Sequence, residues 1–239
     1  MAEPDTDKTS KKIGILGGMG PLATADLFKK IILHTSAASD REHIHIVIDS
    51  NTSIPDRTEF ILGRGPSPLP EMIKTAVNLE KMGADIIVMP CNTAHYFYSD
   101  IKKHIKADFI SMIEETAAQI MKSGSGVRAA LLATEGTCTA GIYDKVFAKK
   151  GMELLKPDKA MQDVVTGVIY NVKKGIYTDY SQSLEKAVKE LKKKGAELFI
   201  LGCTELPLYF ETLGIKEKTA DPTDILARSA VIRAGKNAV

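Results

Sequence analysis

The sequence predicts an α/β protein of two pseudosymmetric lobes, each a mostly parallel sheet flanked by helices, with a cleft between them. Two observations predict this fold. Strand-like apolar runs alternate with helix-like patterns along the chain, as in βαβ units. In addition, the stretch 81–91 matches the stretch 193–203, and each ends in a cysteine, Cys91 and Cys203, at an offset of 112 residues from 91 to 203. Such an internal repeat indicates two similar halves.

In the first half the periodicity of apolar residues sets the expected elements. Pro21 suits the first position of a helix, where its missing N–H costs no hydrogen bond. The stretch 84–90 is apolar throughout, which is typical of a parallel strand buried on both faces. A loop rich in Pro, Gly and Ser, long enough to carry function, spans 50–70. The expected elements are a strand at 13–16, a glycine turn at 17–20, a helix from Pro21, a strand at 43–49, a helix at 71–82 and a strand at 84–90.

The second half follows the same order. Its expected elements are a strand at 127–133, a turn at 134–137, helices at 142–150, 164–175 and 181–194, a strand at 196–201 and a closing helix within 222–239. The first lobe is expected to comprise 12–108 and 215–239, the second lobe 109–214, and residues 1–11 a flexible tail.

Composition excludes several classes of protein. The chain has 239 residues, 44% hydrophobic and 26% charged, with a formal net charge of +2, as in ordinary globular proteins. It has no stripe of basic residues for nucleic acid, and its apolar runs are shorter than the ~18 residues of a membrane span. Residues 1–12 are polar, unlike a signal peptide. Three cysteines without targeting signals favour a reducing, cytoplasmic setting without disulfides.

The repeated cysteines carry the functional prediction. Ligands of open α/β sheets bind beyond the carboxyl ends of the strands, so two facing lobes would bring Cys91 and Cys203 to opposite sides of one cleft. A thiol has a reference pKa of about 8.5, so one can act as base while the other acts as acid. Such a pair can invert a carbon stereocentre without a cofactor. The simpler interpretation is a small apolar residue ending a buried strand; it suits Cys138, which has no repeat partner.

Hydroxyl and amide side chains accompany the two cysteines. Asn92 and Thr93 follow the first, Thr204 follows the second, and Thr134 and Thr137 lie in the first turn of the second lobe. Donors at strand ends can stabilise the carbanion that forms when an α-proton is removed. The alternative role for each is ordinary helix capping.

These motifs resemble those of a known family. The stretches concerned are Met89-Pro-Cys91-Asn92-Thr93-Ala94-His95, Leu201-Gly-Cys203-Thr204-Glu205-Leu206 and Gly17-Gly-Met19-Gly-Pro21. Over nearly the whole chain beyond the tail, the sequence resembles the aspartate/glutamate racemase family, in particular its aspartate racemase branch. The resemblance implies a cofactor-independent racemase of a small dicarboxylic amino acid that forms a homodimer. No metal, nucleic acid or membrane partner is expected from the composition and motifs.

The resemblance also implies site residues. Cys91 and Cys203 match the catalytic pair. Together with the hydroxyl and amide residues described above, the residues expected to bind substrate are Met19, Arg57, Asn92, Thr93, Ala94, Thr134, Thr137, Lys173 and Thr204.

Two further points follow from the matched positions. Arg57 and Lys173 (or the adjacent Lys174) match the residues thought to hold the side-chain carboxylate, although a surface arginine and a lysine at a helix end need no such role. Asp56 and Glu205 are candidates for contacting the substrate ammonium or orienting a neighbour. Glu205 replaces the histidine of the glutamate racemase branch, and the glycine turn replaces its Asp-Ser-Gly; both favour aspartate.

Other functions remain open from the residues alone. The same fold could support a hydantoin racemase, a maleate-type isomerase or a decarboxylase. Residues 18–23 fit a G-x-G-x-x-A pattern, and Asp49 ends the next strand, as in dinucleotide-binding folds. A two-lobed binding protein is a further alternative. Cys91 and His95 are one helical turn apart, yet a zinc site lacks a third ligand nearby, and His95 is better explained by packing.

Overall fold

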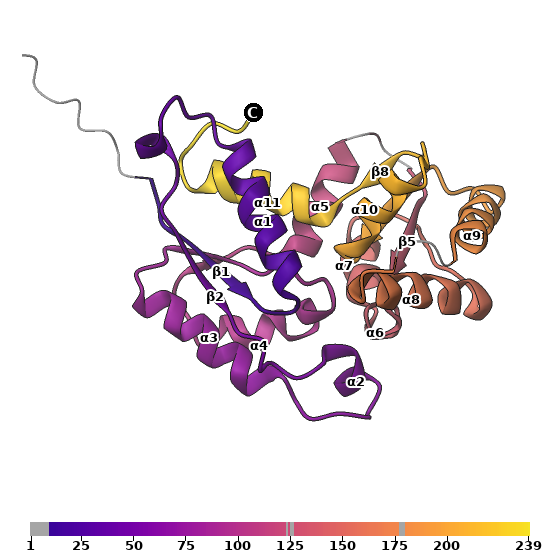
Figure 1. Cartoon of the computed structure of the whole chain (residues 1–239), viewed down its shortest axis with the longest axis horizontal. Helices are drawn as coiled ribbons and strands as arrows, with labels where there is room; N and C mark the ends of the chain where they lie inside the picture. Colours follow the sequence, from indigo (N-terminus) through magenta and orange to yellow (C-terminus); the bar gives the residue numbers. More distant parts are fainter. Residues whose placement is uncertain (1–9, 123, 125–126, 177–179) are drawn as a thin grey trace, which may run out of the picture.

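Two four-stranded sheets form the centres of two lobes (Figure 1). The computed structural model describes residues 10–122, 124, 127–176 and 180–239; residues 1–9 of the expected tail lie outside the described part. The first sheet has the order β2 (Ile46–Ser50), β1 (Ile13–Gly17), β3 (Ile86–Val88) and β4 (Asp108–Phe109). The second has the order β6 (Leu154–Leu155), β5 (Ala129–Ala133), β7 (Leu198–Gly202) and β8 (Thr219–Ala220). All neighbouring strands are parallel.

The registers of the central strands reproduce the internal repeat. In the first sheet Ile13 of β1 pairs with Ile86 of β3, and in the second Ala129 of β5 pairs with Leu198 of β7. The step from 86 to 198 is the repeat offset of 112 residues. The predicted fold of two similar, mostly parallel α/β lobes is therefore confirmed.

Helices cover both faces of each sheet. On the first sheet, α1 (Pro21–His34) and α11 (Pro222–Arg233) cover one face, and α3 (Leu69–Lys81) and α4 (Tyr98–Lys102) cover the other. On the second sheet, α5 (Met112–Lys122) and α7 (Ile142–Lys149) lie opposite α8 (Lys159–Lys173), α9 (Ser181–Lys193) and α10 (Glu205–Thr212). Strand residues therefore alternate between two cores, which explains why β1, β5 and β7 are fully buried, continuous apolar runs.

Several elements differ from the sequence-based expectation. The expected turn at 134–137 is the start of α6 (Glu135–Ala140), because Thr134 caps it by accepting a hydrogen bond from the Thr137 N–H at 3.2 Å. Asp158 caps α8 in the same way and starts it five residues before the expected 164. The expected loop 50–70 contains a short helix, α2 (Arg57–Ile61), and the strand expected at 43–49 begins at 46. Helices α4, α5 and α10 and the edge strands β4, β6 and β8 were not expected.

Strand pairing shifts the expected lobe boundaries at two points. Both residues of β4 pair with β3 in the first sheet, although 109 was expected to open the second lobe. Strand β8 pairs with β7 in the second sheet, although 215–239 was assigned to the first lobe. The reason is that two-residue edge strands leave no apolar run to recognise. Beyond β8 the chain returns to the first lobe, where α11 packs on the core below α1.

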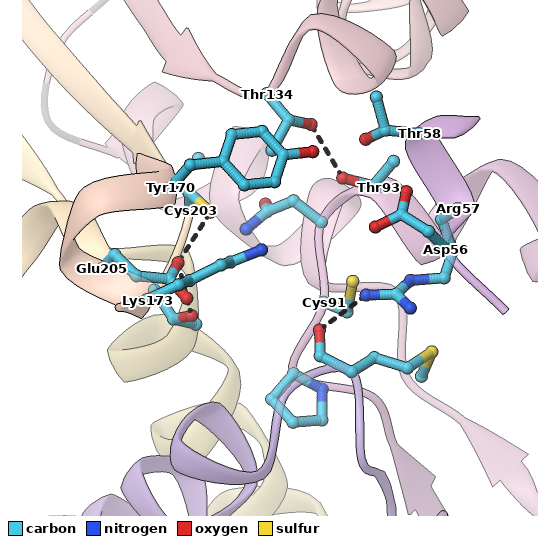
Figure 2. A pocket seen from close by; sticks show the side chains of 15 residues that line it. Asp56, Arg57, Thr58, Cys91, Thr93, Thr134, Tyr170, Lys173, Cys203 and Glu205 are labelled. Atoms are coloured by element: carbon cyan, nitrogen blue, oxygen red, sulfur yellow. Dashed lines mark hydrogen bonds between the residues drawn. The ribbon is translucent and has the colours of Figure 1, made fainter. Parts of the chain in front are cut away.

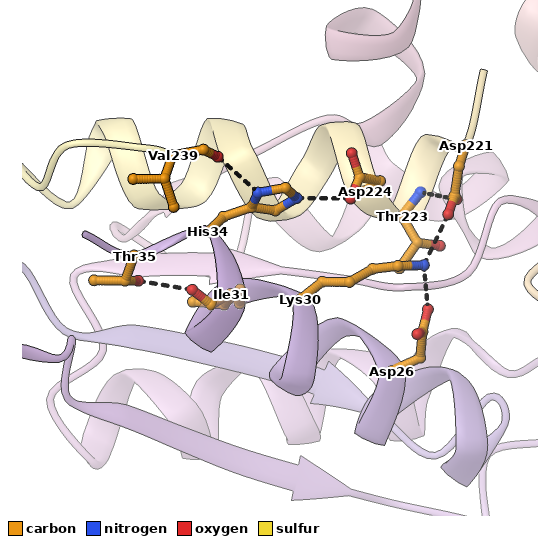
Figure 3. A network of polar contacts seen from close by, with 9 residues as sticks. All are labelled: Asp26, Lys30, Ile31, His34, Thr35, Asp221, Thr223, Asp224 and Val239. Atoms are coloured by element: carbon orange, nitrogen blue, oxygen red, sulfur yellow. Dashed lines mark hydrogen bonds and ion pairs between the residues drawn. The ribbon is translucent and has the colours of Figure 1, made fainter. Parts of the chain in front are cut away.

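Polar contacts on α1 hold this returning segment (Figure 3). The Lys30 ammonium lies 2.6 Å from Asp26 and 2.7 Å from Asp221, which caps α11. His34 contacts the Asp224 carboxylate at 2.6 Å and the Val239 carbonyl oxygen at 3.1 Å. These contacts hold the end of the chain on α1 of the first lobe, directly after β8 of the second. Within the described ranges, no helix is both long and apolar enough to cross a bilayer.

Candidate active site

One cleft between the lobes, at the carboxyl ends of the central strands, gathers most of the candidate residues (Figure 2). It is lined by Met19, Asp56, Arg57, Thr58, Pro90, Cys91, Asn92, Thr93, Thr134, Tyr170, Lys173, Gly202, Cys203, Thr204 and Glu205. Both repeated cysteines therefore open into the same space. Two candidates do not line it: Ala94 is fully buried beneath the cleft, and Thr137 lies in α6 behind Thr93.

The loop after β3 presents Cys91. Its carbonyl oxygen is 2.9 Å from Nδ1 of His95, and Nε2 of the same ring accepts the N–H of Met112 at 3.1 Å. Because Nε2 is the acceptor, Nδ1 carries the proton and donates a hydrogen bond to the backbone carbonyl oxygen of Cys91. Complete burial lowers the pKa of His95 to about 4, so the ring is neutral. His95 therefore fixes the backbone of the cysteine loop and does not contact the thiol.

The loop after β7 presents Cys203 in a different setting. Its thiol donates a hydrogen bond to Oε2 of Glu205 at 2.8 Å, and the Thr204 hydroxyl donates to the same oxygen at 3.2 Å. Enclosure of the sulfur and the negative charge of Glu205 raise the pKa of Cys203 well above its ordinary value, and the Lys173 ammonium opposes this shift.

A cation reaches the cleft from each lobe. Arg57 opens α2, and its terminal nitrogens donate to the carbonyl oxygens of Pro55 and Met19, both at 3.1 Å. Its Nε is buried and has no hydrogen-bond partner within the described residues. The neighbouring Asp56 caps α2 by accepting a hydrogen bond from the Glu59 N–H at 2.9 Å. The helix therefore begins at Arg57.

Lys173, at the end of α8, extends into the cleft opposite Arg57 (Figure 2). Its ammonium lies 5.4 Å from the centre of the Tyr170 ring. Partial enclosure disfavours its charge, but the nearby Cys203 and Glu205 outweigh this and raise the pKa of Lys173. Lys174 is not among the residues that line the cleft.

Hydroxyl groups join the two lobes at the base of the cleft. The Thr93 hydroxyl lies 3.0 Å from that of Thr134 and 2.8 Å from that of Thr137, and the latter two are 3.0 Å apart. Beside them, the fully buried Tyr143 donates its hydroxyl to Oδ1 of Asn92 at 2.6 Å. Asn92 and Thr93 come from the first lobe and the other three residues from the second, so this network sets how closely the lobes approach.

The segment that carries Arg57 also rests against the second lobe. A Cβ atom on Gly136 of α6 would lie 2.8 Å from the Thr58 hydroxyl and 2.9 Å from the Thr58 Cα. Only glycine permits this close approach of α2 to α6. At the other side of the cleft, Gly18 has a φ of +90°, and a Cβ there would collide with the backbone of Asn51. This turn places Met19 in the cleft.

Four lining residues were not expected from the sequence: Thr58, Pro90, Tyr170 and Gly202. Tyr170 had a usable signal, because it lies three residues before Lys173 and thus on the same face of α8. Partial burial and the charge of Asp56 raise the pKa of Tyr170, so it presents a neutral hydroxyl.

The arrangement is suited to proton transfer on an anionic ligand. Two thiols can exchange protons with a ligand between them, and Arg57 and Lys173 supply positive charge for carboxylates. In the part of the chain that the structure describes, no group of three or more His, Cys, Asp or Glu side chains is arranged to hold a metal ion.

Comparison with known proteins places the chain. Residues 16–230 match the family described as Asp/Glu/hydantoin racemase. A broad specificity amino-acid racemase of Bacillus subtilis is 32% identical over 227 residues, covering 92% of this chain and 96% of that protein. The structure of Picrophilus torridus aspartate racemase has a TM-score of 0.79 at 30% identity, covering 96% of each chain. An aspartate racemase homologue from Pyrococcus horikoshii has a TM-score of 0.77 at 28% identity, covering 95% of this chain and 100% of that one. The chain therefore belongs to the Asp/Glu/hydantoin racemase family.

Proposed function

We propose that this protein interconverts L- and D-aspartate without a cofactor, using Cys91 and Cys203 as the two acid–base groups. The observation that carries the proposal is that two cysteines at equivalent strand ends of two similar lobes line one cleft. A single buried cysteine would need no function. Two at matched positions, opening into the same polar cleft, support the roles of a base and an acid on either side of a ligand.

The proposed reaction balances in two proton transfers. The thiolate of one cysteine removes the α-proton, becoming a thiol and leaving a planar carbanion whose charge spreads into the α-carboxylate. The thiol of the other cysteine then donates its proton to the opposite face, forming the other enantiomer and a thiolate. The Asn92 side chain, which lines the cleft, is a candidate donor to the carboxylate as its charge grows.

Charge in the cleft supports a dicarboxylic substrate. Arg57 and Lys173 lie on opposite lobes, and each can take one carboxylate or share the side-chain carboxylate. The Arg57 guanidinium lines the cleft and so presents its charge to such a ligand. Two of the relatives compared above are an aspartate racemase and an aspartate racemase homologue, which favours aspartate. The relative described as a broad specificity amino-acid racemase makes wider acceptance the second candidate.

Deuterium exchange tests the proposal. Purified, reduced protein is incubated in D2O with L-aspartate, and loss of the α-proton and formation of D-aspartate are followed by NMR and chiral chromatography. We expect both to occur without added cofactor. The same assay with glutamate and with neutral and basic amino acids separates the two candidates. If no amino acid exchanges its α-proton or changes its chirality, the proposed racemisation is wrong.

We also propose a homodimer that forms through the outer face of α1. On this helix Leu22 is 79% exposed and Leu33 is 62% exposed, and Phe28 and Ile32 are exposed as well; a second copy that covered them would remove apolar side chains from water. Light scattering should give twice the mass of one chain for the wild type and a smaller mass for Leu22→Lys. A wild-type monomer would refute the dimer. The cytoplasmic location stays a prediction.

A further inference from the structure

The residue two positions after each cysteine differs between the lobes. With the repeat offset of 112 residues, from 91 to 203, Thr93 of the first lobe corresponds to Glu205 of the second. Thr93 is turned away from its own cysteine and bonds to Thr134 and Thr137 of the other lobe. Glu205 instead accepts the hydrogen bond of its own cysteine's thiol. The two thiols are therefore not equivalent.

We propose that Glu205 is a positioning residue that keeps Cys203 protonated while the cleft is empty, so that Cys91 is the thiol left free to give up its proton first. The geometry is that of a donor thiol: Sγ of Cys203 lies 2.8 Å from Oε2 of Glu205, and a thiolate there would place two negative charges in contact. No acidic side chain bonds to the Cys91 thiol within the described residues, so only one cysteine is held in this way.

The other groups near Cys203 define the balance. Lys173 of α8 favours the Cys203 thiolate, whereas Glu205 and the Cys91 sulfur favour the thiol. Tyr170 is also close, because a charge on Cys203 raises the pKa of the Tyr170 hydroxyl. Enclosure of the sulfur adds to the side of the thiol. Removing the Glu205 charge therefore leaves Lys173 less opposed and favours the thiolate.

If the protein is a racemase as proposed above, the two enantiomers bind different protonation states of the cysteine pair. The enantiomer whose α-hydrogen faces Cys91 binds the form in which Cys91 has lost its proton and Cys203 is still a thiol. Its product leaves Cys91 as a thiol and Cys203 as a thiolate; Cys91 then loses a proton to solvent and Cys203 regains one. Because the equilibrium constant of a racemisation is one, kcat/KM is equal in the two directions, and the asymmetry shows only in the separate values of kcat and KM.

Thiol alkylation tests the protonation state without requiring turnover. Iodoacetamide labelling of Cys203 and Cys91 is followed by peptide mass spectrometry between about pH 6 and about pH 10, since only the thiolate reacts. In Glu205→Gln, we expect the Cys203 profile to shift to lower pH and its neutral-pH labelling rate to rise about tenfold, as a fall of one pKa unit gives. Glu211→Gln, on the exposed end of the same helix, is the matched control and should leave both profiles unchanged.

The outcomes separate the two proposals. If the pH midpoint of Cys203 labelling is unchanged in Glu205→Gln, or if labelling at neutral pH is slower, the inference is wrong. Slower labelling is the result expected if Glu205 acts as a base that removes the thiol proton. A shifted profile in a protein that racemises nothing supports the thiol assignment and rejects the proposed function. If Glu205→Gln does not fold, the wild type decides: Cys203, although more exposed than Cys91, must show the higher pH midpoint.

With activity established, a second measurement applies. The kcat values for L- and D-aspartate should become more nearly equal in Glu205→Gln, while the two kcat/KM values remain equal to each other. A purely structural effect of the substitution would lower both kcat values by the same factor and would contradict the inference.

Discussion

The loops after β3 and β7 occupy equivalent places in the two lobes, yet their contacts differ. In the first lobe the loop is held by neutral His95, whose ring bonds to the Cys91 carbonyl oxygen and to the Met112 N–H. In the second lobe the position that matches His95 is Pro207, whose side chain cannot form a hydrogen bond. Among the described residues, the Cys203 thiol bonds to Glu205. A duplicated backbone therefore holds two cysteines symmetrically while their side-chain surroundings make them chemically unequal.

Replacing one cysteine at a time should break the symmetry of the reaction most strongly. We expect Cys91→Ser and Cys203→Ser each to lower racemisation at least about 10³-fold, because each removes one of two proton-transfer groups. Each variant should still exchange the α-hydrogen of one enantiomer in D2O, and the two variants should retain opposite enantiomers. Cys138→Ser is the control: that thiol lies in α6, where burial raises its pKa to about 12. A single variant that still interconverts both enantiomers would contradict the two-base mechanism.

The buried, neutral His95 ring of the first lobe should make the stability of the protein depend on pH. The pKa of His95 is about 4 in the folded protein and 6.5 in the unfolded chain, so the unfolded chain takes up the proton first. The stabilisation is complete above pH 6.5 and is lost as the pH falls towards 4, up to about 3 kcal/mol of unfolding free energy. Urea denaturation at a series of pH values should show this loss in the wild type.

His95→Asn should be less stable at neutral pH and lack this component of the pH dependence. His104→Asn, an exposed histidine, is the control and should retain it. An equal slope in the wild type and His95→Asn would show that the ring is not held neutral.

Replacing Arg57 of the first lobe or Lys173 of the second tests how much each cation contributes to substrate binding. Arg57→Ala should raise KM for aspartate about 100-fold, the effect of losing charged hydrogen bonds to a carboxylate. Lys173→Met should raise KM less, because the lysine is a single flexible charge already close to Glu205. Arg64→Ala removes an exposed arginine that is paired with Glu59 and serves as the control. If Arg57→Ala keeps the wild-type KM, the arginine does not hold the substrate.

The smallest expected effect concerns the contact between the lobes. Thr93→Val keeps the shape of the side chain but removes the hydroxyl shared with Thr134 and Thr137, which remain bonded to each other. We expect a loss of about 1 kcal/mol in unfolding free energy, measured by urea denaturation. Thr212→Val, on the exposed end of α10, should change stability less. A Thr93→Val variant as stable as the wild type would show that the hydroxyl network adds no net stability.

Local sequence patterns predicted the central elements because those elements depend on local rules. Continuous apolar runs mark β1, β5 and β7, and Pro21 marks the start of α1. The edge strands β4 and β8 were missed, since two residues carry no periodicity and exist only through pairing with β3 and β7. Of the candidate site residues, most line the cleft, but Ala94 and Thr137 do not. Their places depend on how the short 3-10 helix Thr93–Phe97 and α6 pack, which spacing alone does not specify.

The sequence by itself determined the duplicated α/β architecture and the placement of one cysteine at the end of an equivalent strand in each lobe. The reason is that the 112-residue repeat, from 91 to 203, fixes both strand and cysteine through local patterns. Only the tertiary structure decided which groups surround each thiol. Contacts such as those of Glu205 with Cys203, Thr93 with Thr134 and Gly136 with Thr58 depend on side-chain direction and on the approach of the two lobes. These distances are set by the packing of the whole molecule.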